Sequence, residues 1–145
     1  MKVGAFLATV FLAAQTEHIT PFTGTWKLNV AKSSFDPGPP PESFTITFTR
    51  DGTRHINLIG ADGQTRQVSL PWSDGKEVPV TGMENTTASS TILGTRFHDI
   101  WKQNGKMIED VRGVLSPNGR TLTIAVQGKT GQHGFHNHLI FDNNN

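Results

Sequence analysis

The sequence predicts an all-β protein, an antiparallel up-and-down β-barrel of about ten strands. Hydrophobic and polar residues alternate between turn signals, most regularly over residues 44–49, as in a strand with one buried face. No stretch shows the apolar period of about 3.6 residues that marks an amphipathic helix. The turn signals are Asp-Gly and Asn-Gly pairs, at Asp51-Gly52, Asp62-Gly63, Asp74-Gly75, Asn104-Gly105 and Asn118-Gly119.

The spacing of these turns sets the expected strands. An Asn-Gly or Asp-Gly pair favours a tight hairpin because both central residues of a type I′ turn take positive φ. Strands joined so tightly must hide their outer edges, and closure into a barrel does so; a flattened sandwich is the alternative. We expect strands near residues 24–30, 43–50, 53–60, 64–71, 76–81, 87–93, 95–103, 106–115, 120–128 and 134–142.

The connection over residues 31–42 differs from the tight turns. It contains four prolines, at positions 37, 39, 40 and 41, which disfavour a helix and stiffen the chain. We expect this segment to be extended and to fold over or beside the mouth of the barrel.

The N-terminal segment has the pattern of a secretory signal. Lys2 precedes an apolar run that ends in the small residues Ala13 and Ala14, and the run is too short to span a bilayer. We therefore assign residues 1–19 to a signal peptide and residues 20–145 to the barrel domain. The mature chain would begin between about residues 15 and 20, carry no integral membrane segment, and be secreted or periplasmic in a bacterium.

Composition excludes several classes of function. The chain has 13 Lys and Arg against 12 Asp and Glu, with no basic stripe, so nucleic acid is not an expected partner. Cysteine is absent, so an exported form would rely on its core without disulfides. No nucleophile elbow, phosphate loop, His-Glu-x-x-His motif or cysteine nucleophile occurs, and we expect no enzyme activity. The oligomeric state stays open.

A Gly-x-Trp motif opens the first expected strand, in Gly24-Thr25-Trp26-Lys27-Leu28. Glycine allows close passage of a neighbouring segment, and the indole two residues later lies on the same face, where it can plug a barrel end. The segment resembles the first strand of fatty-acid-binding proteins, in the calycin superfamily that includes the lipocalins. The resemblance implies a lipocalin-like barrel that holds a small, largely apolar ligand, with Gly24 and Trp26 structural at one end.

The same resemblance suggests ligand contacts. Val111-Arg112 is similar to a pair that supplies an inward arginine for the ligand carboxylate in fatty-acid-binding proteins. The family's second anchor, Arg-x-Tyr on the last strand, is replaced by the apolar residues 139–141, which favours neutral or weakly acidic ligands. If Trp101 faces inward, the alternation carries Asp99 inward too. The expected ligand-binding residues are Arg112, Trp101, His55, Asn57 and Gln67.

Two alternatives remain open beside this binding role, for which we expect no cofactor. His136 and His138 share one face of the last strand, and His98 in a nearby strand could complete a site for a transition metal or haem. The apolar residues at 135, 139 and 141 compete with that pair for the interior. The second alternative is a filled barrel with a structural or interaction role in the cell envelope.

Overall fold

Residues 20–144 are described by a computed structural model, in which the strands form one 11-stranded sheet. The predicted signal peptide lies outside these residues. No helix among them is long and apolar enough to cross a membrane. The strands are β1 (Gly24–Leu28), β2 (Ser34–Asp36), β3 (Ser43–Phe48), β4 (Thr53–Ile59), β5 (Thr65–Pro71), β6 (Val78–Pro79), β7 (Thr86–Leu93), β8 (Arg96–Gln103), β9 (Lys106–Leu115), β10 (Thr121–Thr130) and β11 (His133–Asn143), with 3₁₀ turns η1 (Thr20–Phe22) and η2 (Val30–Lys32).

The strand order confirms the predicted antiparallel barrel. Neighbours run β5-β4-β3-β1-β11-β10-β9-β8-β7-β6, so β1 joins the first half of the chain to the last strand. Between β5 and β6 the ring is held by one isolated bridge between Ser69 and Thr81, whose two N–H···O contacts measure 3.0 and 2.9 Å. The barrel is therefore nearly closed.

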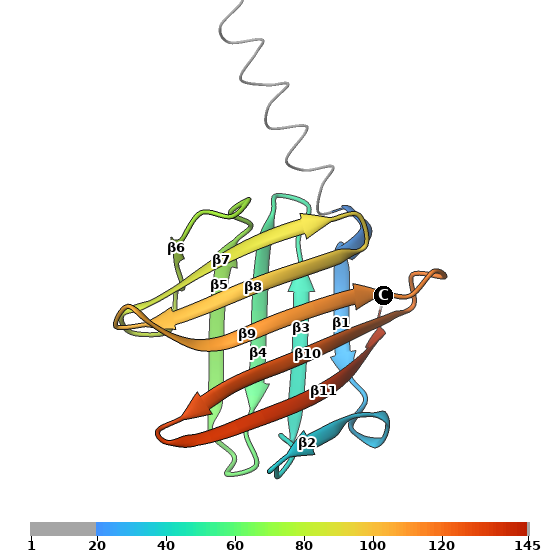
Figure 1. Ribbon diagram of the computed structural model, residues 1–145. Helices are drawn as coiled ribbons and strands as arrows, with labels where there is room; N and C mark the ends of the chain where they lie inside the picture. The colour runs from blue at the N-terminus through green and yellow to red at the C-terminus, as the bar shows by residue number, and fades with distance from the viewer. Residues whose placement is uncertain (1–19, 145) are drawn as a thin grey trace, which may run out of the picture.

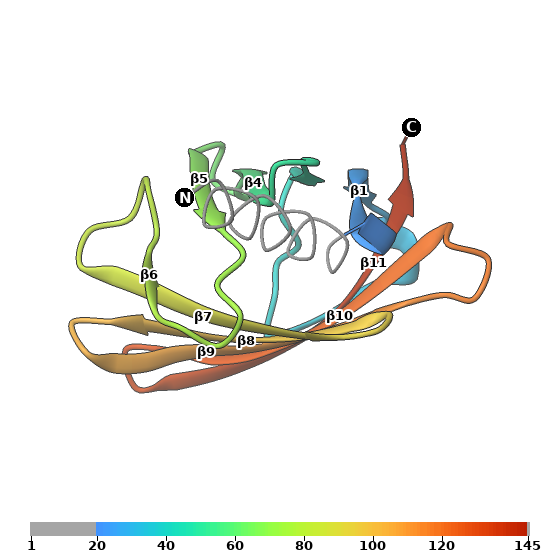
Figure 2. The same ribbon diagram turned by 90° about the horizontal axis from the view of Figure 1, so that it is seen from above.

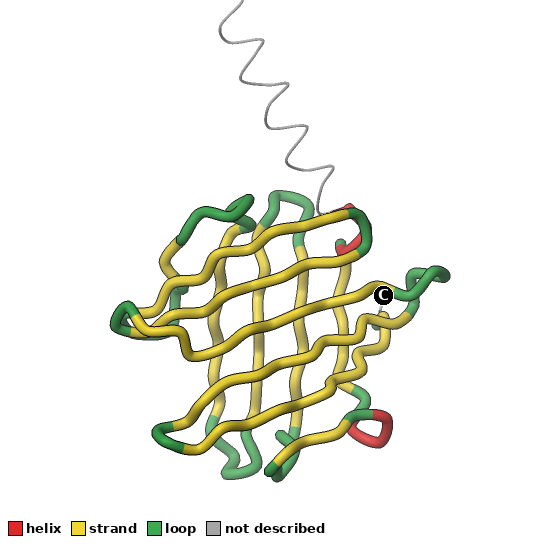
Figure 3. Tube along the Cα trace, viewed as in Figure 1, coloured by secondary structure: helices red, strands yellow, loops and turns green. Residues whose placement is uncertain are grey.

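The barrel has two layers whose strands cross. In Figure 1, β1, β3, β4 and β5 run along one direction behind β7, β8, β9 and β10, which cross them. Viewed from above in Figure 2, β11 bends out of the lower layer to reach β1, which joins the layers along one side. Figure 3 shows that strands make up most of the trace, with loops gathered at its edges. The inner faces of both layers thus enclose one interior.

The alternation in each strand directs one set of side chains into this interior. On β3 the buried residues are Ile46 and Phe48, with the intervening Thr47 on the outer face. Trp26 of β1 is 1% exposed, and its Nε1 donates a hydrogen bond of 2.9 Å to the carbonyl oxygen of Phe22 in η1. Trp26 and Phe22 therefore seal the end of the barrel at which β1 begins, where Gly24 pairs with Phe48.

The turn dipeptides adopt two geometries. Between β8 and β9, Asn104 and Gly105 both have positive φ, at 52° and 78°, as the predicted type I′ turn requires. Between β3 and β4 only the glycine of Asp51-Gly52 does so, at 91°. The Asp51 carboxylate there accepts a 3.0 Å hydrogen bond from the Thr53 amide, which stabilises a longer loop.

Three strands depart from the expected boundaries. β1 ends at Leu28 because the Asn29 side chain caps η2, accepting a hydrogen bond from the Lys32 amide at 3.2 Å. β6 is confined to Val78–Pro79, where proline offers no amide for a longer ladder. β2 was not expected, and it pairs with residues 136–138 of β11, beyond the part of β11 that pairs with β1.

Candidate functional site

The interior of the barrel contains a cavity of about 480 Å³. Its size falls in the range of small-molecule sites. Both layers contribute to its wall, which is mainly aliphatic and aromatic. The apolar lining residues include Phe44, Ile46, Ile56, Leu58, Val111, Ile124, Val126 and Leu139.

The proline-rich segment lies at the mouth of this cavity, as the sequence predicts. Phe35 of β2 faces the cavity, and prolines of the following loop line it. The β4–β5 turn, at Gly60 and Ala61, borders the same opening. Because proline fixes φ, this border is stiffer than an ordinary loop. The mouth is therefore formed by loops and a short strand, without a helical lid in the described part of the chain.

An ion pair crosses the barrel at the inner end of the cavity. Arg54 of β4 donates from Nη1 to Oδ2 of Asp99 on β8 at 2.5 Å, and from Nη2 to the Ser90 hydroxyl at 3.0 Å. Arg54 is 3% exposed and Asp99 is fully buried. Trp101 Nε1 also lies 3.4 Å from Oδ2 of Asp99, as a long hydrogen bond. These contacts tie one layer of the barrel to the other.

Aromatic rings surround the guanidinium of this pair. Its carbon lies 4.4 Å from the ring centroid of Trp72 and 5.5 Å from that of Phe97. Trp72 stacks on Phe48 with an interplanar angle of 11°. Cation–π attraction therefore adds to the ion pair in holding Arg54 in place. Arg54 Nε and Asp99 Oδ1 have no hydrogen-bond partner among the described residues and are buried beside the cavity.

Glu109 of β9 is the other acidic residue of the cavity wall. It is half-buried and lies opposite Trp101 on β8 and Gly128 on β10. Burial raises the pKa of the Glu109 carboxyl, the charge of Arg66 lowers it, and the charge of Asp99 raises it further. Arg66 lines the cavity from β5 and is exposed to solvent.

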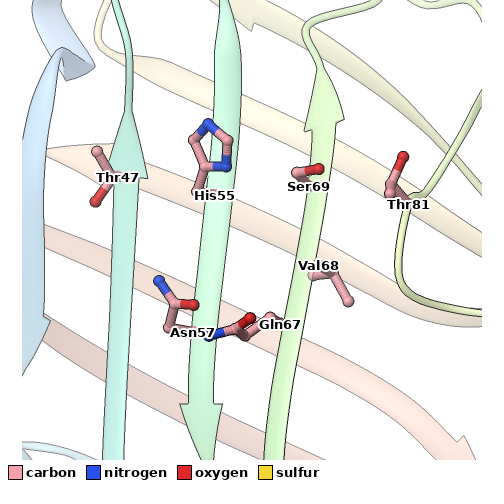
Figure 4. Close-up of a pocket in the computed structure, with 7 residues that line it drawn as sticks. All are labelled: Thr47, His55, Asn57, Gln67, Val68, Ser69 and Thr81. Carbon is pink, nitrogen blue, oxygen red and sulfur yellow. The ribbon is translucent and has the colours of Figure 1, made fainter.

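The structure divides the predicted ligand residues between two faces. Trp101 is 5% exposed and lines the cavity, and Asp99 accompanies it inward as the alternation predicts. His55, Asn57 and Gln67 lie together, but on the outer face of β4 and β5. Figure 4 shows them beside Thr47, Ser69 and Thr81. Together these residues line a surface pocket of about 430 Å³. These three predicted ligand-binding residues therefore do not line the cavity, because β4 turns the alternate residues, Arg54, Ile56 and Leu58, toward it.

Arg112 also lies outside the cavity. Its side chain is 66% exposed, and its Nε is 3.3 Å from Oδ1 of Asp110 on the same outer face. The neighbouring Val111 takes the inward position on β9. The barrel therefore has no inward arginine at position 112 to grip a ligand carboxylate.

The strand order keeps His98 apart from His136 and His138, the other two histidines of the metal alternative. His136 and His138 are exposed on β11, where β2 pairs alongside them. His98 lies on β8, bonded to Asp110 through Nε2 at 3.1 Å. β9 and β10 separate the two sites, a distance of about 14 Å at ordinary strand spacing. Within residues 20–144, no cluster of three or more His, Cys, Asp or Glu could hold a metal ion.

Sequence reasoning missed Arg54 and Glu109 as interior residues. The signal for Arg54 was present, because it shares parity with Ile56 and Leu58 on one strand. Glu109 shares parity with Val111 in the same way. Both residues are charged, and charged side chains on a strand usually face solvent. No pattern in the neighbouring sequence identifies Asp99 as the partner of Arg54.

Comparison with solved structures shows the same fold. Echinococcus granulosus fatty-acid-binding protein 1 aligns with a TM-score of 0.58 at 12% identity, covering 87% of this chain and 99% of that one. Apo lipid binding protein 8 of Caenorhabditis elegans gives 0.57 at 15% identity, covering 86% and 96%. A mutant of the fluorescent protein UnaG gives 0.55 at 14%, covering 87% and 98%.

The predicted calycin-type resemblance is thereby confirmed at the level of fold: this chain folds as the fatty-acid-binding proteins do. No family model and no curated protein sequence matches the chain. The structures named above are described as lipid-binding or fluorescent proteins.

Proposed function

We propose that this protein binds a small, largely apolar molecule inside its barrel. The observation that carries the proposal is the cavity of about 480 Å³ between the layers, lined mainly by apolar side chains. An unfilled interior of this size forgoes packing contacts that a filled core would make, and an apolar ligand would supply them. Two of the structurally similar proteins are named as fatty-acid-binding and lipid-binding proteins. This similarity supports an apolar ligand and a binding role in place of catalysis.

The polar groups of the cavity disfavour a carboxylate grip. Arg54 is already paired with Asp99 at 2.5 Å, and Arg112 lies on the outer face. At the end of β11, Leu139 and Phe141 present apolar side chains to the interior. A ligand in this cavity would gain most of its affinity from apolar burial, at about 25 cal/mol per Å².

A cavity-filling substitution tests the binding role. Val126 of β10 lines the cavity, whereas the next residue, Gln127, is exposed on the outer face. Titration with Nile red, a neutral apolar dye, should show saturable fluorescence with the wild type. We expect Val126→Trp to weaken dye binding by more than about tenfold, a change of about 1.4 kcal/mol. The matched control Gln127→Trp should bind like the wild type.

The opposite results would remove the proposal. If the wild type does not bind the dye, the cavity is not a site for apolar ligands. If the two tryptophan variants bind as well as the wild type, the dye occupies another surface. Near-ultraviolet circular dichroism of each variant establishes that the barrel has folded.

We further propose that the protein acts in the periplasm or outside a bacterial cell. The charged start and moderate apolar run before residue 15 support this location, as does the absence of cysteine from the whole chain. N-terminal sequencing of the native protein should give a start between about residues 15 and 20. Recovery of an intact Met1 would contradict export by this route.

A further inference from the structure

Glu109 offers an unpaired carboxyl group to the cavity, and this inference rests on the proposed binding function. The residue lies on β9 two positions before Val111, so both side chains share the inward face. Its carboxyl group forms no hydrogen bond or close ion pair with another described residue, although the charge of Arg66 acts on it and lowers its pKa. Partial burial of a carboxyl without a partner is unfavourable, because its oxygens lose part of their hydration and gain no donor in exchange.

The other charged groups of the cavity wall are occupied or lie at its edge. Arg54 and Asp99 neutralise each other through their 2.5 Å contact. Arg66 is exposed to solvent, so water screens its charge. Apart from Asp99 Oδ1 and Arg54 Nε, the unpartnered atoms of that ion pair, the cavity wall offers the Glu109 carboxyl as a free hydrogen-bond acceptor. No unpaired buried cation lines the cavity among the described residues.

We propose that the ligand is an apolar molecule whose polar group donates a hydrogen bond to Glu109, as a hydroxyl or an amine does. Such a donor would satisfy the carboxyl within an apolar wall, where the local dielectric strengthens a hydrogen bond. A carboxylate ligand would place a second negative charge beside the first, and like charges so close repel. Burial raises the pKa of Glu109, and a hydroxyl can pair with its carboxyl in either protonation state.

Competition between head groups on one alkyl chain tests this selectivity. Dodecanol, dodecylamine and dodecanoate are each titrated against the wild type carrying bound Nile red. We expect dodecanol and dodecylamine to displace the dye at concentrations about tenfold or more below dodecanoate, as for a hydrogen bond to a charged group. Glu109→Gln removes the charge and keeps the shape of the side chain. In this variant, the displacing concentration of dodecanoate should be within about threefold of those of dodecanol and dodecylamine; the dodecanoate concentration divided by either of the other two is the head-group ratio.

The neighbouring residue supplies a matched control. Asp110 lies next to Glu109 but faces outward, against His98 and Arg112. Asp110→Asn removes the same charge from the protein and should leave the head-group ratio of the wild type unchanged. An equal effect of Asp110→Asn and Glu109→Gln would assign the selectivity to net charge and overturn the proposal.

The remaining outcomes are also decisive. Equal or tighter binding of dodecanoate to the wild type would overturn the role of Glu109 while leaving the apolar cavity in place. A head-group ratio that Glu109→Gln leaves unchanged would overturn the role of Glu109 in the same way. Failure of Nile red itself to bind would instead overturn the binding function on which the inference rests.

Discussion

Removal of Arg54 should expose the dependence of the barrel on its cross-layer ion pair. Arg54→Met keeps much of the side-chain length and apolar bulk, and removes the guanidinium that lies over the Trp72 ring. Asp99 is fully buried, and its Oδ2 would lose the 2.5 Å donor from Arg54 and keep the long contact to Trp101 at 3.4 Å. The variant therefore leaves a carboxylate buried without a counter-charge.

The expected loss is large compared with the stability of a small domain. Breaking a buried pair at one partner costs about 3–5 kcal/mol, against a total of about 5–15 kcal/mol. The loss of cation–π contact adds to this figure. Replacing both partners, as in Arg54→Met with Asp99→Val, removes the buried charge altogether. The double variant should thus be more stable than Arg54→Met alone, because such replacements are often neutral or stabilising.

Urea unfolding followed by tryptophan fluorescence measures these differences. With a slope of about 1–3 kcal/mol/M, Arg54→Met should lower the midpoint by at least about 1 M. The double variant should recover part of that shift. A loss under about 1 kcal/mol in Arg54→Met, or a double variant less stable than the single one, would refute the reasoning, since neither fits a desolvated pair.

Three further predictions concern the barrel end, the outer face and the cavity wall. Trp26→Ala should cost about 3–5 kcal/mol in urea unfolding because the indole is 1% exposed; under about 1 kcal/mol would place it on the surface. Arg112→Met should change stability by no more than about 0.5 kcal/mol and leave dye binding intact, and weakened binding would give this exposed residue a role. Burial raises the pKa of Glu109 above 4.5, so the folded state binds more protons and its stability falls as pH rises through that range. Glu109→Gln should therefore gain stability over the wild type at neutral pH and lose the gain below about pH 4, whereas a constant difference would contradict the raised pKa.

Local signals in the sequence were sufficient for the strand framework. Asn104-Gly105 predicts a type I′ hairpin because both residues accept positive φ, and both adopt it. Gly24-x-Trp26 predicts a buried indole near a barrel end from the shared parity of its two residues, and Trp26 has that environment. Strand alternation is likewise local, and it gives the inward faces of β3, β10 and β11.

The composition of the site depended on contacts that no local pattern encodes. Arg54 and Asp99 are separated by 45 residues, and they meet because the two layers face each other across the interior. His98 and His136 appear compatible as metal ligands until β9 and β10 are placed between their strands. On β4, Arg54, Ile56 and Leu58 alternate regularly with His55 and Asn57. Because Arg54 is charged, the sequence alone does not identify its face of the strand as the inward one.

Nuclear Overhauser contacts between bound dodecanol and the side-chain methyl groups of the protein test the central claim most directly. Ile124 and Leu139 line the cavity, whereas Leu93 is 83% exposed and Met107 is 60% exposed on the outer surface. An interior binding site predicts contacts from the alkyl chain to Ile124 and Leu139 and none to the exposed pair. Contacts confined to Leu93 or Met107 would contradict binding inside the barrel.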